Sequence, residues 1–98
     1  MAEIRWTAEA ERWLQDIFGY IAEDNPEAAA DTVEGIFDRS QVLRTHPEIG
    51  YHYEPIQDRE VRILLFGHYR IAYLLKRDGS IDILGVFHGA LDIGRYLL

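Results

Sequence analysis

Two stretches in the first half of the chain repeat apolar residues at intervals of three and four, the period of an amphipathic helix. The first covers residues 8–23 and follows Thr7, whose hydroxyl can accept hydrogen bonds from the free N–H groups of a helix start. The second begins with Asn25 and Pro26, an N-cap residue and a residue preorganised for the first turn, and runs to about Arg44. Because only Asp24 and Asn25 connect the two stretches, the sequence predicts an antiparallel helical hairpin.

Shorter segments alternate apolar and polar residues, which is the pattern of a β-strand. One precedes the first helix and three follow the second, and the turn pair Asp78 and Gly79 separates the last two. These segments are residues 3–6, 59–66, 69–76 and 80–88. Helices grouped apart from an antiparallel meander are typical of the α+β class. We therefore predict a single domain, residues 1–98, with the order strand, helix, helix and three-stranded antiparallel meander (β-α-α-β-β-β) and with the helical hairpin packed on one face of the sheet.

The predicted strands carry apolar side chains on both faces, and two helices can cover only one of them. Either the tail at residues 89–98, as a short helix or an ordered extension, covers the second face, or a partner chain does. Residues 46–58, rich in aromatic and polar groups, are expected to form a loop. Gly35 lies inside the second helix, where glycine costs up to about 1 kcal/mol relative to alanine. A close crossing of another element over Gly35 would explain it.

Composition narrows the class of protein. With 48% hydrophobic and 28% charged residues the chain can build a core, and the absence of cysteine excludes disulfides, thiolate metal sites and cysteine nucleophiles. The first residues lack the basic and apolar regions of a secretory signal, and no apolar run approaches the ~20 residues of a membrane-spanning helix. We therefore expect a cytoplasmic protein with no membrane contact.

Charge is unevenly distributed along the chain. The net charge is −7, a poor match for nucleic-acid phosphates, so direct DNA binding is not expected. Residues 1–38 hold ten acidic and two basic residues, whereas residues 59–77 hold five basic residues and one acidic residue. This later basic segment is interpreted either as ordinary strand-edge charge or as a binding face for an anionic partner.

A few residues could support catalysis or metal binding, although their spacing matches no catalytic or metal-binding motif. Arg70 could bind a phosphate through its guanidinium, and His88 could act as an acid or base near neutral pH, but each could equally make a structural contact. Glu54 and Glu60 are candidate bases by residue type alone. His52 with Glu54 could hold a metal ion, although a surface position in the loop is the simpler interpretation. We predict no metal site and no cofactor.

Several short motifs follow one another in a recognisable order. The most specific are Tyr-Arg-Ile-x-Tyr after a turn, at residues 69–73, and His-Gly-Ala-x-Asp after the last strand, at residues 88–92. The others are Trp6 with Thr7, Tyr20 with Ile21, Asn25 and Pro26 with Ala28 and Ala29, Leu43 with Pro47 and Gly50, and Val86 before the last motif. From Ile4 to Leu97, this order resembles the ParE/RelE superfamily of toxins from type II toxin–antitoxin modules, often called plasmid-stabilisation proteins.

The resemblance implies a compact toxin that a small antitoxin neutralises by wrapping it with an extended or helical tail. One branch, ParE-like, inhibits DNA gyrase without cleaving nucleic acid, whereas the RelE-like branch cleaves mRNA at the ribosome. We favour the ParE-like branch, because the chain is acidic and because Leu91 stands where the family commonly has arginine in His-Gly-Ala-Arg-Asp. The alternatives are a RelE-like endoribonuclease (mRNA interferase) that uses Arg70 and His88, or an inactive protein with the toxin fold.

The predicted partner is a cognate antitoxin whose acidic or amphipathic segment covers the apolar face and the basic segment, so that hetero-oligomers can form. In the ParE-like interpretation the predicted target is DNA gyrase. The residues predicted to contact the antitoxin or the target are Arg59, Arg62, Arg70, Tyr73, His88 and Asp92.

Overall fold

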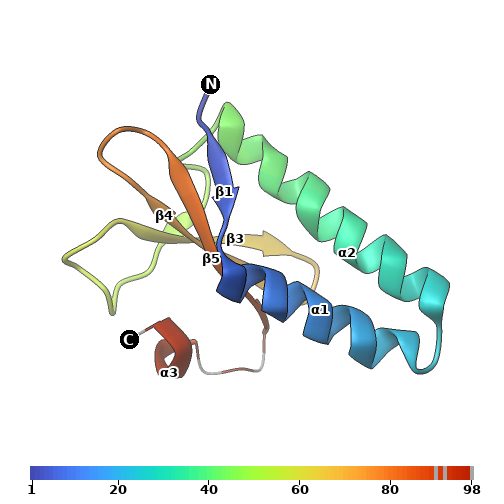
Figure 1. The fold of residues 1–98 in the computed structure, drawn as a ribbon. Helices are drawn as coiled ribbons and strands as arrows, with labels where there is room; N and C mark the ends of the chain where they lie inside the picture. Colours follow the sequence, from blue (N-terminus) through green and yellow to red (C-terminus); the bar gives the residue numbers. More distant parts are fainter. Residues whose placement is uncertain (90, 92, 98) are drawn as a thin grey trace.

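The helices and strands of the computed structural model follow the predicted order, with one additional short strand (Figure 1). The structure describes residues 1–89, 91 and 93–97. The first half holds β1 (Ile4–Trp6), α1 (Ala8–Ala22), α2 (Pro26–Ser40) and a 3₁₀ turn (Gln41–Arg44). The second half holds β2 (Tyr51–His52), β3 (Val61–Phe66), β4 (Tyr69–Leu75), β5 (Ile81–His88) and the short α3 (Gly94–Leu97). The predicted α+β class is confirmed.

Both long helices begin where their capping residues predict. The side chains of Thr7 and Asn25 each accept a hydrogen bond of 3.1 Å from the backbone N–H three residues ahead. The second helix ends earlier than expected, because α2 stops at Ser40 and a 3₁₀ turn follows. The Ser40 hydroxyl donates to the carbonyl of Phe37 at 2.6 Å, a local bond that competes with the regular helix ladder. No helix in the described ranges combines the length and apolar composition needed to cross a membrane.

The strands form one mixed five-stranded sheet in the order β1-β5-β4-β3-β2. The predicted antiparallel meander is confirmed as β3-β4-β5, and β1 joins it in parallel beside β5, with Ile4 opposite Ile81. The segment expected to be a loop, residues 46–58, contains β2, which pairs with β3 through Tyr51 opposite Ile63. The two residues of β2 are too few to produce an alternating pattern, so the sequence could not predict this strand.

The turn between β4 and β5 forms at the predicted Asp-Gly pair. Gly79 adopts a φ of +88°, in the left-handed region that glycine enters without steric cost. The carboxylate of Asp78 accepts hydrogen bonds from the hydroxyl and the backbone N–H of Ser80, at 2.6 and 2.9 Å. These bonds favour the charged form and hold the pKa of Asp78 below its ordinary value. The turn thereby fixes the pairing of the two longest strands.

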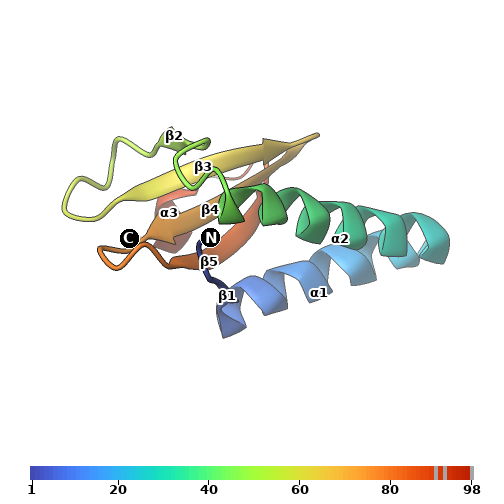
Figure 2. The same cartoon turned by 90° about the horizontal axis from the view of Figure 1, so that it is seen from above.

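The helical hairpin covers one face of the sheet, here called the helix face, and its free end extends past the strands (Figure 1, Figure 2). Gly35 of α2 faces Phe66 of β3, where an added Cβ would lie 2.6 Å from the Cζ atom of Phe66. The close crossing expected at Gly35 is therefore confirmed. The buried residues of this core are Ala10, Ile36, Leu43, Leu64, Ile71, Tyr73, Ile81, Ile83 and Val86.

The opposite face, here called the tail face, is covered in part by the C-terminal segment of the same chain. Ile93 is 2% exposed, and the ring of Tyr96 stacks on that of Phe87 with 5.7 Å between centroids. Of the two coverings predicted for this face, the tail is the one that the structure contains, but Leu74 and Leu84 stay only half-buried beside it. The buried residues of this second core are Ile63, Ala72, Phe87 and Ile93.

Candidate functional site

The two residues predicted for a ribonuclease, Arg70 and His88, point to opposite faces of the sheet. In the ladder between β4 and β5, Tyr69 lies opposite His88 and Arg70 lies opposite Phe87. Phe87 belongs to the core of the tail face, and successive side chains of a strand alternate between faces. Arg70 therefore points to the tail face and His88 to the helix face, and the two side chains do not converge on one reacting group.

The guanidinium of Arg70 is bound to the backbone of the C-terminal segment. Its Nη2 atom donates hydrogen bonds to the carbonyl of Leu91 at 2.6 Å and to that of Gly89 at 3.2 Å. A guanidinium carries several donors in a fixed plane, so one side chain can hold two points of a neighbouring segment. Arg70 thus fastens the tail to the sheet, which is the structural role that the sequence left open beside the catalytic one.

His88 lies exposed at the end of β5, beside two aromatic rings. Its ring centroid is 5.8 Å from that of Tyr69, edge to face, and 6.3 Å from that of His68, nearly parallel. These three rings lie at the end of the β4–β5 pair, where a partner bound on the helix face can contact them. Asp92, predicted as a contact residue in the same motif, lies outside the described residues.

Tyr73, predicted to contact a partner, is fully buried instead. Its hydroxyl donates to the carbonyl of Pro47 at 2.7 Å and accepts from the N–H of Gly50 at 3.0 Å. Burial raises the pKa of the Tyr73 hydroxyl. The expectation of a surface position is wrong for Tyr73, because its side chain lies on the helix face and ties the loop before β2 to the centre of the sheet.

Arg62, also predicted as a contact residue, holds the same loop. Its Nε atom pairs with a carboxylate oxygen of Glu60 at 2.8 Å, and its Nη1 atom donates to the carbonyls of Gly50 at 2.7 Å and Glu48 at 3.0 Å. These contacts neutralise the charge of Arg62 and occupy its donors, which leaves it a mainly structural role.

Arg59 is exposed, as a contact residue must be, and lines a polar pocket of about 650 Å³ where β3 begins and β4 ends. Its Nε atom lies 3.8 Å from an oxygen of the adjacent Asp58, which is a loose contact. The pocket gathers most of the basic segment that the sequence singled out. Its lining residues are His52, Gln57, Asp58, Arg59, Glu60, Arg62, Leu74, Leu75, Lys76 and Arg77.

Asp82 binds two cations on the tail face, a cluster that the sequence analysis did not identify. Its carboxylate accepts hydrogen bonds from Nη2 and Nε of Arg5 at 3.0 and 3.1 Å, and lies 3.1 Å from Nζ of Lys76. Two cations share one carboxylate, so the cluster keeps a net positive charge. The bonds from Arg5, more than any other contact, hold the pKa of Asp82 below its ordinary range. In the sequence, the signal for this cluster is Asp82 itself, an acidic residue within the otherwise strongly apolar segment 81–87.

We expect Asp82 to make folding stability depend on pH in acid. Its pKa is lower in the folded chain than the ordinary value of 3.8, so its stabilising contribution is complete above that value and is lost as the pH falls through the folded pKa. Urea unfolding midpoints measured between neutral pH and strong acid should fall less for Asp82→Asn than for the natural chain. An equal fall in both proteins would contradict this role of Asp82.

An apolar cleft of about 550 Å³, here called the α1 cleft, lies between α1 and the ends of β4 and β5. Tyr20 borders it with 80% of its surface exposed. Ile17 and Ile21 belong to the apolar repeat that predicts this helix. The repeat does not show that the hairpin extends past the sheet and leaves these residues uncovered. The lining residues are Trp13, Asp16, Ile17, Tyr20, Ile21, Tyr69, Val86, His88 and Leu91.

The pair considered for a metal ion, His52 and Glu54, lies in the loop around β2. The Nδ1 atom of His52 lies 3.8 Å from an oxygen of Glu54. Within the part of the chain that the structure describes, no three His, Cys, Asp or Glu side chains lie close enough to hold a metal ion. The polar pocket and the α1 cleft, which lie on different parts of the sheet, are the candidate protein-binding surfaces.

The chain is similar to known proteins over most of its length. Residues 4–93 match the family described as the ParE toxin of the type II toxin–antitoxin system parDE. The chain is 37% identical over 87 residues to "Putative toxin Y4kP" of Sinorhizobium fredii (strain NBRC 101917 / NGR234), which covers 87% of this chain and 85% of the relative.

A solved structure, "Chromosomal ParDE TA system from P. aeruginosa", has a similar fold, with a TM-score of 0.73 and 24% identity over 90% of this chain and 96% of the other. The family match and the curated relative both agree with the resemblance inferred from the motifs. They show that this chain belongs to the ParE toxin family of type II toxin–antitoxin systems.

Proposed function

We propose that this chain is a ParE-like toxin that acts by binding a protein target, DNA gyrase, and that a cognate antitoxin neutralises it. The family supplies the class of protein, and the arrangement of side chains favours binding over catalysis. The observation that carries the proposal is the separation of Arg70 and His88 by the sheet.

Arg70 supports the proposal through its contacts. Cleavage of RNA requires a cation at the phosphate together with an acid or base close enough to reach the same reacting group. The Nη2 atom of Arg70 instead holds the carbonyls of Gly89 and Leu91, on the face away from His88. A ribonuclease that used both residues would need the tail to detach and the strand to turn over.

Leu91 and the net charge of the chain also favour a protein-binding toxin over a ribonuclease. Leu91 stands where much of the family has arginine, and here it lines the apolar α1 cleft. A net charge of −7 also opposes docking among ribosomal RNA phosphates. A RelE-like endoribonuclease is the second candidate, since His88 is exposed beside Tyr69 and His68. The third candidate is a protein that has the toxin fold but is not toxic.

We assign the contact with the protein target to the α1 cleft. Its lining is mostly apolar, with exposed Tyr20 at its border and His88 at one end. Aromatic side chains beside an apolar hollow are the residues that most often dominate the binding energy of protein interfaces. The cleft is built by α1 and two strands, so it is preformed on rigid elements and costs little ordering on binding.

Expression of the chain alone is expected to arrest bacterial growth and to induce the DNA-damage response. Tyr20→Ala should require a markedly higher expression level for the same arrest, because truncation of an interface tyrosine typically weakens binding by tenfold or more, ~1–2 kcal/mol. Growth and a damage-response reporter are followed at matched protein levels, with the antitoxin absent.

Phe18→Ala is the matched control, because Phe18 lies on the same helix, is 41% exposed and does not line the cleft. It should leave toxicity unchanged. Equal toxicity of the natural chain and Tyr20→Ala would contradict the assignment of the target contact to the α1 cleft. Growth arrest with cut mRNA but no damage response would favour the ribonuclease.

A further inference from the structure

The α1 cleft combines an apolar lining with the acidic surface of the helical hairpin beside it. We propose that the cleft recognises an amphipathic segment of the protein target in which basic side chains flank apolar ones, an inference that rests on the proposed function. The chemistry of this segment follows from the lining of the cleft and from the charges around it.

Most of the lining of the α1 cleft is apolar. Ile17, Ile21 and Leu91 line it, and each is only half-buried, so each presents apolar surface to a bound segment. Of the described residues that line the cleft, Asp16 alone is acidic, and the imidazole of His88 lies at one end. A segment that fills the cleft therefore needs apolar side chains, with a polar or charged group only where it meets Asp16.

Asp16 and Tyr20 lie side by side on α1 at the border of the cleft. They are four residues apart, the spacing that places two side chains on neighbouring turns of one helix face. Both side chains are exposed, and Asp16 forms no ion pair with any residue that the structure describes. A lysine or arginine placed between them would pair with the carboxylate and contact the face of the tyrosine ring, and both contacts are attractive.

The surface around the cleft is acidic beyond Asp16. Residues 1–38 hold ten acidic residues, and none of the ten forms an ion pair within the described ranges. Arg12 is the one basic residue of α1, and the last turn of this helix has none. Glu23 and Asp24 follow at the free end of the hairpin, where the helix dipole is also negative (Figure 2). This field attracts a cationic segment to the cleft.

The same charge disfavours the other occupants of an exposed apolar cleft. A nucleic acid or an anionic membrane would bring negative charge to a surface that repels it, as would the acidic segment predicted for the antitoxin. A second copy of this chain, docked symmetrically through the cleft, would place two acidic helices together. A basic amphipathic segment is the occupant that both the apolar lining and the charge favour, and an amphipathic helix laid in an apolar groove is a common mode of recognition.

The test is the binding of labelled synthetic peptides to the purified full chain. The probe is a peptide with leucine and lysine at the spacing of an amphipathic helix, and the comparison is the same peptide with glutamate in place of lysine. We expect the natural chain to bind the basic peptide more tightly by on the order of tenfold or more. The affinity for the basic peptide should fall as salt is added, because salt screens the attraction between exposed charges.

Asp16→Lys should weaken binding of the basic peptide on the order of tenfold, because it replaces an attraction at the cleft by a repulsion. Tyr20→Ala should also weaken it, whereas Tyr20→Phe should retain the affinity, since phenylalanine keeps the ring face. Asp16 and Tyr20 are exposed, so the fold should survive these substitutions, and circular dichroism checks this.

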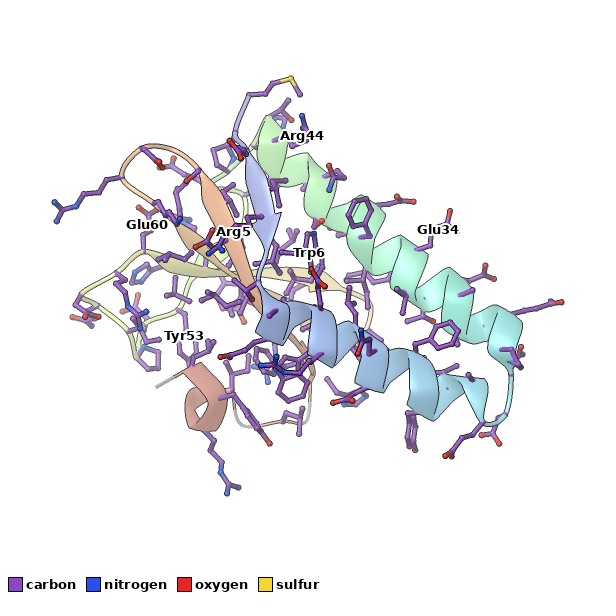
Figure 3. All side chains as sticks on the ribbon, in the orientation of Figure 1. Arg5, Trp6, Glu34, Arg44, Tyr53 and Glu60 are labelled. Carbon is purple, nitrogen blue, oxygen red and sulfur yellow. The ribbon has the colours of Figure 1, made fainter. Side chains whose placement is uncertain are left out.

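Glu34→Lys is the matched control, because it changes the net charge of the chain by the same amount as Asp16→Lys. Glu34 is exposed on α2, does not line the cleft, and points away from α1 (Figure 3). It should leave the affinity for the basic peptide nearly unchanged at physiological salt. Equal affinity for the basic and acidic peptides, no loss in Asp16→Lys, or an equal loss in Asp16→Lys and Glu34→Lys would each overturn the inference.

Gyrase supercoiling and growth, measured with the same proteins, separate this inference from the proposed function. A chain that inhibits gyrase but shows no preference for the basic peptide contradicts the inference about the target segment and leaves the proposed function standing. A chain that binds the basic peptide with the expected loss in Asp16→Lys, yet neither inhibits gyrase nor arrests growth, contradicts the proposed function and leaves the α1 cleft as a site for basic amphipathic segments.

Discussion

Gly50→Ala is expected to destabilise the fold by about 3 kcal/mol, because a side chain at this position has no space. An added Cβ would lie 2.7 Å from the carbonyl oxygen of Ile63 and 2.7 Å from the hydroxyl of Tyr73. Neither can move away freely, since the carbonyl belongs to a strand and the tyrosine is fully buried. The substitution also strains the hydrogen bond from Gly50 N–H to Tyr73, measured at 3.0 Å. Urea unfolding at neutral pH measures the loss.

Gly19→Ala provides the matched comparison. Gly19 lies in α1, and a Cβ added there would meet no atom within 4 Å, so alanine should stabilise the chain by about 1 kcal/mol through helix propensity alone. Replacing glycine by alanine is therefore expected to lower the free energy of unfolding at residue 50 and to raise it at residue 19. A Gly50→Ala chain as stable as the natural one would show that the loop before β2 is not anchored to Tyr73 as described.

Arg70→Ala is expected to cost about 2 kcal/mol and to release the C-terminal segment. The guanidinium holds the carbonyls of Leu91 and Gly89, and the segment beyond them places Ile93 and Tyr96 on the tail face. Amide hydrogen exchange at residues 93–97 should accelerate more than exchange in the helix core, because local opening of the tail becomes easier.

Arg77→Ala is the control for the loss of a basic side chain. Arg77 is exposed, and within the described ranges it forms no ion pair, so its removal should change stability by less than about 0.5 kcal/mol. Arg70→Lys should restore only part of the stability, because the ammonium of lysine does not reproduce the position of Nη2, the atom that donates to both carbonyls. Unchanged exchange in Arg70→Ala would contradict a tethering role and reopen a role in chemistry for Arg70.

The sequence predicts the fold well where local signals agree. Thr7, Asn25 and the Asp78–Gly79 turn mark boundaries that the structure keeps, because capping and turn preferences act through neighbouring residues. The strand at Tyr51 escapes prediction, because two residues cannot show a period. The parallel pairing of β1 with β5 is a contact distant in sequence, and no local pattern encodes it.

The candidate site is predicted less well, because residue type does not reveal what a side chain contacts. Arg70, Tyr73 and Arg62 have the chemistry of contact residues, but long-range hydrogen bonds commit them to the tail and to the loop before β2. Arg59 and His88 keep the exposure that a binding role needs. The α1 cleft depends on the length of the hairpin relative to the sheet, which the helical period alone does not give.

The most direct test of the central claim is the effect of the purified chain on gyrase and on translated mRNA, measured side by side. We expect the chain to block the supercoiling of relaxed plasmid by gyrase and to leave ribosome-bound mRNA intact, with Tyr20→Ala weaker than Phe18→Ala in the gyrase assay. Cleaved mRNA together with full gyrase activity would contradict the account and assign the chain to the ribonuclease branch.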